Sequence, residues 1–151
     1  MSPPRRSSRK VRERSSEYLA ASARSLLLDT HVWLWWNAGD RRLGKRARSA
    51  IQAAQEVYFS VASAWEIALK VELGKLELPE NGDIVTELAQ DGFRPLSIEL
   101  KHVLRVATLP RIHRDPFDRL LVCQAREDNL TLLTADPVFS RYDVPVRSAL
   151  E

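Results

Sequence analysis

The stretch that decides the fold is LLLDTHVWLWW, residues 26–36. Its three leucines form a short apolar run that predicts a buried strand, and Asp29 ends that run. The residues from Val32 to Asn37 predict a helix directly after the strand. A buried strand that ends in an acid and leads into a helix is typical of parallel α/β sheets, whose functional sites form beyond the carboxyl ends of the strands.

The rest of the chain continues this alternation of strand and helix. Further strands are predicted at residues 57–59, 94–98, 130–134 and 144–146. Helices are predicted at residues 45–54, 60–73, 82–90, 98–107 and 116–127. Strands that alternate with helices predict an α/β fold, in which a parallel sheet of four to five strands is flanked by helices.

Residues 1–24 differ in composition from everything that follows. They hold seven Lys or Arg and two Asp or Glu, with few large apolar residues. This composition predicts a basic, disordered tail before one domain at residues 25–148. The tail is either a basic arm that attracts RNA or a merely solvated segment, such as an over-long start of the reading frame. The remainder holds 16 basic and 18 acidic residues, so any positive charge for binding nucleic acid must be placed locally.

The composition also excludes some classes of protein. Cys123 is the only cysteine, which rules out an intrachain disulfide and is compatible with a reducing compartment. No apolar run approaches the ~18 residues of a membrane helix. We therefore expect a cytoplasmic protein that does not associate with membranes.

Four acids that are far apart in the sequence are expected at one edge of the sheet. Asp29 ends the first strand, and Asp136 follows the strand at residues 130–134. Glu66 lies early in the helix after the second strand. Asp118 lies near the start of a helix that runs down into strand 130–134, so that helix must begin at the carboxyl edge of the sheet.

Carboxylates that cluster in this way repel one another unless a cation is present. Clusters with only oxygen ligands suit Mg²⁺ or Mn²⁺, which prefer octahedral oxygen coordination. Zinc is disfavoured because the sequence has no set of Cys and His ligands. His31, His102 and His113 show no metal-ligand spacing, and we expect none of them to bind metal.

Each acid taken alone also has a structural interpretation, because acids are common at helix starts and turns. The alternatives are a cap at Asp29, a capping box of Ser63 with Glu66, a cap at Asp115 or Asp118 beside Pro116, and a turn at Asp136 before Pro137. Only the convergence of the four acids favours a catalytic site.

Other residues invite a functional interpretation with less support. Trp33, Trp35 and Trp36 can stack on bases, but their crowding after a strand favours a core or an interface. Cys123 lies in an apolar helix, which favours a buried small hydrophobe over a nucleophile. A basic run is equally compatible with phosphate binding and with a solvated helix face; it comprises Arg41, Arg42, Lys45, Arg46 and Arg48.

Four segments closely resemble the VapC toxins of the PIN-domain family. They are LLLDTHVWLWW (26–36), SVASAWEIALKVELGKL (60–76), HRDPFDRLLVCQA (113–125) and LLTADPVF (132–139), in the family's order. The resemblance implies a PIN-like, Rossmann-like parallel sheet. It also implies a metal-dependent endoribonuclease that is a homodimer and is held inactive by a cognate antitoxin.

The resemblance assigns roles to individual residues. Asp29, Glu66, Asp118 and Asp136 match the family's acids and would be both catalytic residues and ligands of one or two Mg²⁺ ions. The implied reaction is hydrolysis of RNA phosphodiester bonds by a metal-activated water, leaving 5′-phosphate and 3′-hydroxyl ends. Arg114 and Arg119 are candidates for phosphate contact or for a salt bridge that orients Asp118. Thr30 and Thr134 are candidates for hydroxyls that hold the metal ligands in place. Asp115 belongs to the same motif but has no assigned role.

Three hypotheses for the function follow. The first is a toxin ribonuclease, and the second is a PIN-domain nuclease in RNA processing or quality control. The third is a catalytically silent module that binds RNA or a protein partner, and the presence of all four acids disfavours it. Metal titration separates the third hypothesis from the other two, and a neighbouring antitoxin reading frame separates the first from the second.

Overall fold

The computed structural model describes residues 24–79 and 82–151. Within them, five parallel strands form one sheet in the order β3-β2-β1-β4-β5. The strands are β1 (Ser25–Leu28), β2 (Glu56–Ser60), β3 (Arg94–Leu96), β4 (Thr131–Thr134) and β5 (Val146–Ser148). The predicted α/β class with a parallel sheet is confirmed. The predicted tail lies outside the described residues except for Arg24, so its disorder stays a prediction.

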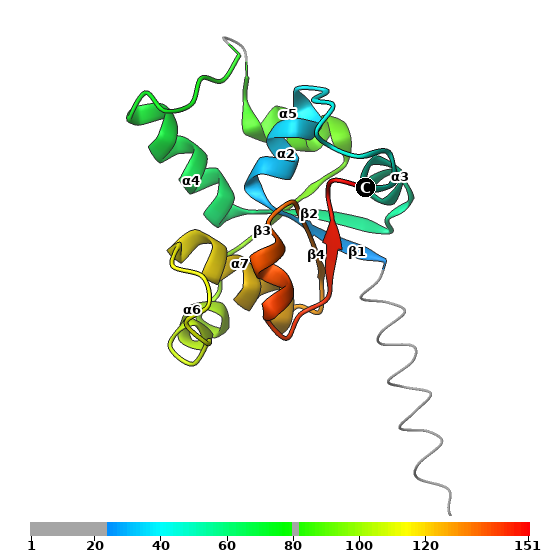
Figure 1. Ribbon diagram of the computed structural model, residues 1–151. Helices are drawn as coiled ribbons and strands as arrows, with labels where there is room; N and C mark the ends of the chain where they lie inside the picture. Colours follow the sequence, from blue (N-terminus) through cyan, green and yellow to red (C-terminus); the bar gives the residue numbers. More distant parts are fainter. Residues whose placement is uncertain (1–23, 80–81) are drawn as a thin grey trace, which may run out of the picture.

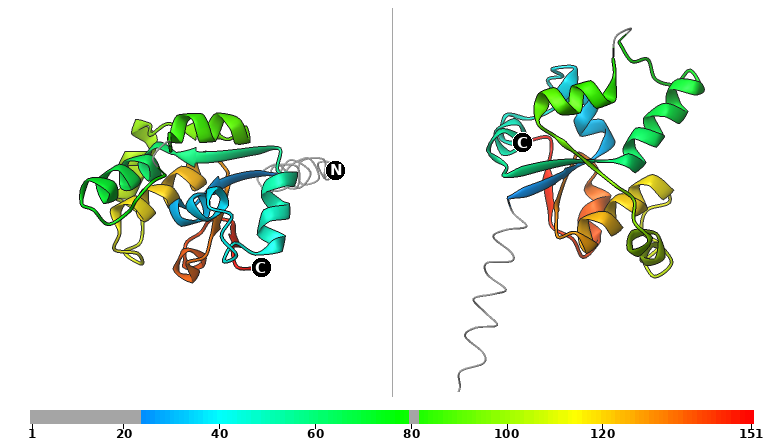
Figure 2. Two further views of the ribbon diagram at one scale, coloured as in Figure 1. Left: turned by 90° about the horizontal axis from the view of Figure 1, so that it is seen from above. Right: turned by 180° about the vertical axis from the view of Figure 1, so that it is seen from behind.

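Helices cover both faces of the sheet (Figure 1). They are α2 (Thr30–Asn37), α3 (Lys45–Ala53), α4 (Val61–Glu72), α5 (Ile84–Asp91), α6 (Leu100–Val106), α7 (Pro116–Glu127) and the 3-10 helix η1 (Pro137–Arg141). In Figure 1 and in the right view of Figure 2, α2, α3 and α5 lie above the sheet, with α6 and α7 below it. None of the helices in the described ranges is long and apolar enough to cross a membrane.

The leucines of β1 explain why this strand is apolar at every position. Side chains alternate between the two faces of a strand. Leu26 and Leu28 therefore pack with Trp33 of α2 on one face, while Leu27 packs with Leu121 of α7 on the other. All three leucines are buried, as expected for a parallel strand that is covered on both sides.

The order of the strands places a crevice beside β1. The chain runs from β1 to β2 and β3 on one side, and then returns to add β4 and β5 on the other side of β1. Crevices at such reversals, beyond the carboxyl ends of the strands, are the usual sites of α/β sheets. Asp29 ends β1 at this point, and its amide donates to the carbonyl of Leu133 in β4 at 3.0 Å.

The helix starts settle two of the capping alternatives. Ser60 caps α4 because its hydroxyl accepts from the amide of Ala62 at 3.0 Å, so the capping box that would start at Ser63 is not formed. Asp115 caps α7, since its carboxylate accepts from the amide of Phe117 at 2.8 Å. Asp118 therefore does not cap this helix and lies in its first turn.

The segment after β5 is held against the start of α3. The amide of Gly44 donates to the carbonyl of Ala149, and the amide of Ala47 donates to the carbonyl of Glu151, both at 2.8 Å. A methyl group on Gly44 would lie 2.2 Å from the carbonyl oxygen of Glu151. Only glycine therefore fits at this position without moving the backbone.

We predict that Gly44→Ala lowers the free energy of unfolding by about 1–3 kcal/mol, the usual cost of forcing extra volume into a packed site. Thermal melts measure this loss, with Ser49→Ala on the exposed side of α3 as the control. Equal melting temperatures for the two variants would show that residues 149–151 do not pack here in solution.

Candidate active site

The four predicted acids line one open pocket of about 320 Å³ at the carboxyl edge of the sheet. The pocket is lined by Asp29, His31, Trp35, Glu66, Lys70, Asp115, Asp118, Ala135 and Asp136. These residues come from the ends of β1 and β4, from α2 and α4, and from the start of α7. The topology thus brings together acids that the sequence separates by up to about a hundred residues.

Asp29 is fixed at the bottom of this pocket. Its side chain is buried, with 5% of the residue exposed, and the hydroxyl of Thr134 donates to its Oδ2 at 2.7 Å. It stands at the N-cap position of α2 but makes no capping hydrogen bond through its carboxylate within the described residues. Burial raises the pKa of Asp29, and the hydrogen bond from Thr134 opposes that rise.

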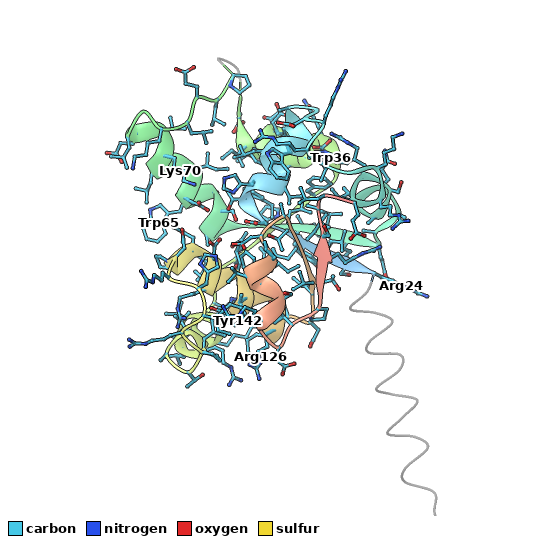
Figure 3. The ribbon with its side chains drawn as sticks, viewed as in Figure 1. Arg24, Trp36, Trp65, Lys70, Arg126 and Tyr142 are labelled. Atoms are coloured by element: carbon cyan, nitrogen blue, oxygen red, sulfur yellow. The ribbon has the colours of Figure 1, made fainter. Side chains whose placement is uncertain are left out.

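Glu66 is held by two neighbours on opposite sides of its carboxylate. The hydroxyl of Thr30 donates to Oε2 at 2.7 Å and lies 2.9 Å from the hydroxyl of Ser63. Lys70, one turn further along α4 (Figure 3), pairs with Oε1 at 2.7 Å. Glu66 is only 6% exposed, and it lies inside α4, whose cap is Ser60, so it does not cap this helix.

Asp118 is an acid of the pocket whose pKa is strongly raised. Burial, together with the negative charges of Asp29 and Asp115, raises the pKa of Asp118 to about 7. Nearby, the Nε2 atom of His113 lies 3.1 Å from Asp118 Oδ2 and lowers that pKa in part. Burial and the neighbouring carboxylates thus outweigh the opposing effect of His113 on this pKa.

Asp136 both forms a turn and borders the pocket. Its Oδ1 accepts from the amide of Val138 at 2.9 Å at the start of η1, as the structural alternative proposed. Its Oδ2 lies 2.9 Å from His113 Nε2. Partial burial raises the pKa of Asp136, but the amide of Val138 and the His113 ring outweigh it, so that pKa lies below its ordinary value.

His113 lies beside two of the predicted acids. Ligand atoms of His113, Asp118 and Asp136 all lie within 4.8 Å of one another. We expected no metal-binding role for this histidine, because no regular spacing of ligands surrounds it in the sequence. The only indication in the sequence was that His113 stands five residues before Asp118, in the loop that leads into α7. Its second neighbour, Asp136, follows the carboxyl end of β4.

Arg119 does not have the position that was predicted for it. Its guanidinium donates to the carbonyls of Val106, Leu109 and Pro110 at 2.9–3.2 Å. These bonds tie the end of α6 to α7, and the expected salt bridge to Asp118 is not formed within the described residues. Arg114 is exposed next to the pocket-lining Asp115, and in the described chain it makes no hydrogen bond or ion pair.

The tryptophans, Cys123 and the basic run, which also invited a functional interpretation, lie in different surroundings. Trp33 and Cys123 are buried in the core, whereas Trp35 lines the pocket. In the basic run, Arg42 forms hydrogen bonds of 2.6–3.1 Å with Asp40. The run is therefore partly fixed at the surface by its own neighbours rather than turned toward the acids.

The residues of the pocket fit a hard divalent cation. Asp29, Glu66 and Asp118 present carboxylate oxygens to one small space, and burial raises the pKa of Asp29 and of Asp118. Of the cationic side chains that line the pocket, Lys70 is already paired with Glu66. A bound cation with a preference for oxygen ligands would relieve the remaining repulsion.

We predict that Thr134→Val weakens binding of a divalent cation by about 10–100-fold, because hydroxyls behind metal ligands orient and stabilise them. The substitution keeps the shape of the side chain but removes the donor to Asp29 and the acceptor for the amide of Asp136, which lies at 3.0 Å. Calorimetric titration with Mn²⁺ measures the affinity. Thr108→Val, which removes an exposed hydroxyl, is the control, and equal Mn²⁺ affinities would contradict the prediction.

The acids cluster where the strand order reverses, which is the place at which parallel α/β domains carry their functional sites. Residues 26–145 match the PIN domain family, and the chain belongs to this family. It is also similar to Ribonuclease VapC22 of Mycobacterium tuberculosis, with 31% identity over 115 residues, which are 74% of this chain and 87% of that protein. The resemblance to VapC proteins is thus confirmed.

Solved structures share the fold at low sequence identity. A chain of VapBC2 from Rickettsia felis, bound to a DNA fragment from its promoter, superimposes with a TM-score of 0.63 at 14% identity, covering 82% of this chain and 98% of that one. A chain of DNA-bound VapBC from Salmonella typhimurium gives 0.59 at 15% identity, with coverages of 82% and 97%. FitAcB from Neisseria gonorrhoeae gives 0.57 at 20% identity, with coverages of 80% and 95%.

Proposed function

We propose that this protein is an Mg²⁺-dependent endoribonuclease, with Mn²⁺ as a possible substitute, and that it is the toxin of a VapBC-type toxin–antitoxin pair. The observation that carries the proposal is the pocket in which Asp29, Glu66, Asp118 and Asp136 converge in a PIN domain. The similarity to a VapC ribonuclease supports RNA as the substrate. We expect the enzyme to act in the cytoplasm, where cellular RNA lies.

The proposed metal ligands are the four acids, with Asp29 and Asp118 at the centre and His113 beside Asp118 and Asp136. When bound, Mg²⁺ would lower the pKa of a water nucleophile and neutralise charge on the phosphate. The protein's own part is to hold the carboxylates in place through the hydroxyls of Thr134 and Thr30. We expect products with 5′-phosphate and 3′-hydroxyl ends.

Two cationic residues are placed to attract the RNA backbone to an acidic pocket. Lys70 lines the pocket, and Arg114 is exposed beside Asp115 and free of partners in the described chain. Arg114 is therefore our candidate for phosphate contact, whereas Arg119 is not, because its donors are used by backbone carbonyls. An unpaired arginine can form a bidentate contact with a phosphate.

The proposed protein partner is a cognate antitoxin. The similar solved structures include a toxin–antitoxin complex and complexes of VapBC with DNA. A basic antitoxin segment that presents Arg to the acids would block both metal and RNA. We also propose a homodimer, since exposed apolar side chains on α4 and α6, such as Trp65 and Leu100, offer a surface for a second copy; Figure 3 shows Trp65 at the outer edge of α4.

Metal dependence tests the catalytic proposal directly. We predict that Mg²⁺ or Mn²⁺ supports cleavage of RNA by the purified protein and that EDTA abolishes it, because the acids alone provide no positive charge for the phosphate. Mapping of 5′ ends in total RNA after controlled induction identifies the target. Full cleavage in metal-free buffer would overturn the proposed mechanism.

Co-expression tests the role as a toxin. The small reading frame next to this gene should rescue growth and co-purify with the protein if it encodes the antitoxin. If it does neither while the purified protein still cleaves RNA, the chain is a PIN-domain nuclease with another duty.

A further inference from the structure

A second pocket opens directly beside the candidate active site. It has a volume of about 480 Å³ and lies between α2, the end of α4 and the start of α5. We call it the side pocket; its lining includes Leu34, Trp35, Arg42, Lys75, Leu78 and Ile84. His31, Trp35 and Lys70 line both pockets, so the two pockets adjoin one another.

The chemistry of the side pocket differs from that of the acidic pocket. Its walls are largely apolar, and Leu34 of α2, Leu78 and Ile84 are among the residues that form them. Lys75 is exposed at its edge and has no side-chain partner in the part of the chain that the structure describes. The lining also includes Asp40, Glu77 and Glu87, and Asp40 is paired with Arg42, so it is Lys75 that offers an unpaired positive charge to a phosphate. Apolar walls beside such a charge suit a flat, apolar ring that is attached to an anionic backbone.

Trp35 is the aromatic residue at the boundary between the pockets. It is half-buried, and the guanidinium of Arg42 lies 4.9 Å from the centre of its ring. Arg42 is in turn held by Asp40 through hydrogen bonds of 2.6–3.1 Å. The indole is therefore a supported aromatic surface next to the acids.

The two neighbouring tryptophans have other duties. Trp33 is 2% exposed and packs against Phe59 in the core. The indole N–H of Trp36 donates to Asp91 at 2.9 Å, which links α2 to α5, and Trp36 lies toward α5 while Lys70 lies on α4 (Figure 3). Trp36 lines neither the side pocket nor the acidic pocket.

We propose that the side pocket holds an unpaired base of the RNA substrate, next to the phosphate that is cleaved, and that Trp35 selects this base by stacking. The inference rests on the proposed ribonuclease function. RNA whose phosphate lies among the acids necessarily carries a neighbouring nucleotide within reach of the adjoining pocket. Aromatic stacking of splayed bases is the usual way in which proteins recognise single-stranded RNA. Trp35 is thus a specificity-determining residue, and Lys75 is placed to contact the backbone.

The test compares Trp35→Leu with the matched variant Trp36→Leu on the same helix. Purified proteins digest deproteinised total bacterial RNA in Mg²⁺, and the 5′ ends of the products are sequenced. The wild-type protein is expected to show a nucleotide preference at one position beside the cut. Trp35→Leu should lose this preference, while Trp35→Tyr and Trp36→Leu should keep it. The preference is a ratio, so a change in the amount of folded protein does not alter it.

A second measurement assigns the effect to the base itself. An RNA oligonucleotide that spans a mapped site is made with and without the base at the preferred position. Loss of the base should raise KM for the wild-type protein by about tenfold or more, consistent with one lost stacking contact. For Trp35→Leu, KM should be nearly the same with and without the base. For Trp36→Leu, loss of the base should raise KM as much as it does for the wild-type protein.

Three outcomes would overturn the proposal. If Trp35→Leu keeps both the preference and the sensitivity to the missing base, the base lies elsewhere. If Trp35→Leu leaves cleavage unchanged but loses the co-expressed antitoxin, the side pocket holds a protein segment. Absence of any Mg²⁺-dependent cleavage by the wild-type protein would instead overturn the proposed function, and this inference with it.

Discussion

Asp118→Asn is expected to lower RNA cleavage by at least about tenfold, which corresponds to ~1.4 kcal/mol of transition-state stabilisation, while the protein stays folded. Asp118 lines the acidic pocket, and Asp115 caps α7 in its place. The substitution therefore removes a negative charge without removing a cap, and the new amide can still contact His113. Cleavage at saturating Mg²⁺, paired with a thermal melt in EDTA, measures the two effects separately.

The pH dependence of stability gives this prediction a second readout. The folded state holds a proton on Asp118 up to a pH of about 7, whereas the pKa of an unperturbed aspartate is 3.8. Because the folded state binds the proton more tightly, stability without metal falls as the pH rises from about 4 to 7 and changes no further through this group above that range. Asp118→Asn should flatten this fall between pH 5 and 7. Asp143→Asn, at an exposed position, should leave it unchanged.

An Asp118→Asn protein that is stable and fully active would remove this residue from the site. One that no longer melts cooperatively in EDTA would contradict the claim that Asp118 is dispensable for folding. Relief of carboxylate repulsion predicts instead that its stability without metal holds or rises.

Glu66→Gln should also lower cleavage by at least about tenfold. Glutamine keeps the length of the side chain, and its carbonyl oxygen can still accept from Thr30, which lies 2.7 Å from Oε2 in the wild-type protein. What disappears is the charge that pairs with Lys70 and would pair with a metal. Because Lys70 is partly exposed, we expect water to solvate it and the loss of stability to be small.

Glu72→Gln provides the matched control for this variant, because Glu72 is exposed on the same helix. Cleavage rates and calorimetric titration with Mn²⁺ should change for Glu66→Gln and not for Glu72→Gln. Equal rates for the two variants would show that Glu66 is a structural residue whose charge serves only its pair with Lys70.

The fold was predictable because its strands are marked locally. The leucine run before Asp29 is apolar at every position, as a strand buried on both faces must be, and helical stretches separate it from the next strands. Once the strands are parallel, the edge at which Asp29, Glu66 and Asp118 meet follows from the chain direction alone. This is why acids without any common spacing were predicted to lie together.

The rest of the site depends on contacts that no local pattern encodes. His113 becomes a neighbour of Asp136 only when the loop before α7 packs against η1. Arg119 stands next to Asp118 in sequence, but its position on the helix directs it to the carbonyls at the end of α6. Likewise, Trp33 and Trp35 are two residues apart, and the turn of α2 buries Trp33 in the core, at the back of the side pocket, while Trp35 is half-buried and lines both pockets.

The hydrogen bond between Thr134 and Asp29 joins residues that are 105 positions apart, and it has a consequence for the order of folding. Contacts between such distant residues form slowly, because a long loop must close before they contribute any stability. The pairing of β1 with β4 is thus expected late, after β1 has met β2. Until then the acids have no common edge to share. We therefore expect a chain still being synthesised to be harmless to RNA until residues 131–134 have left the ribosome.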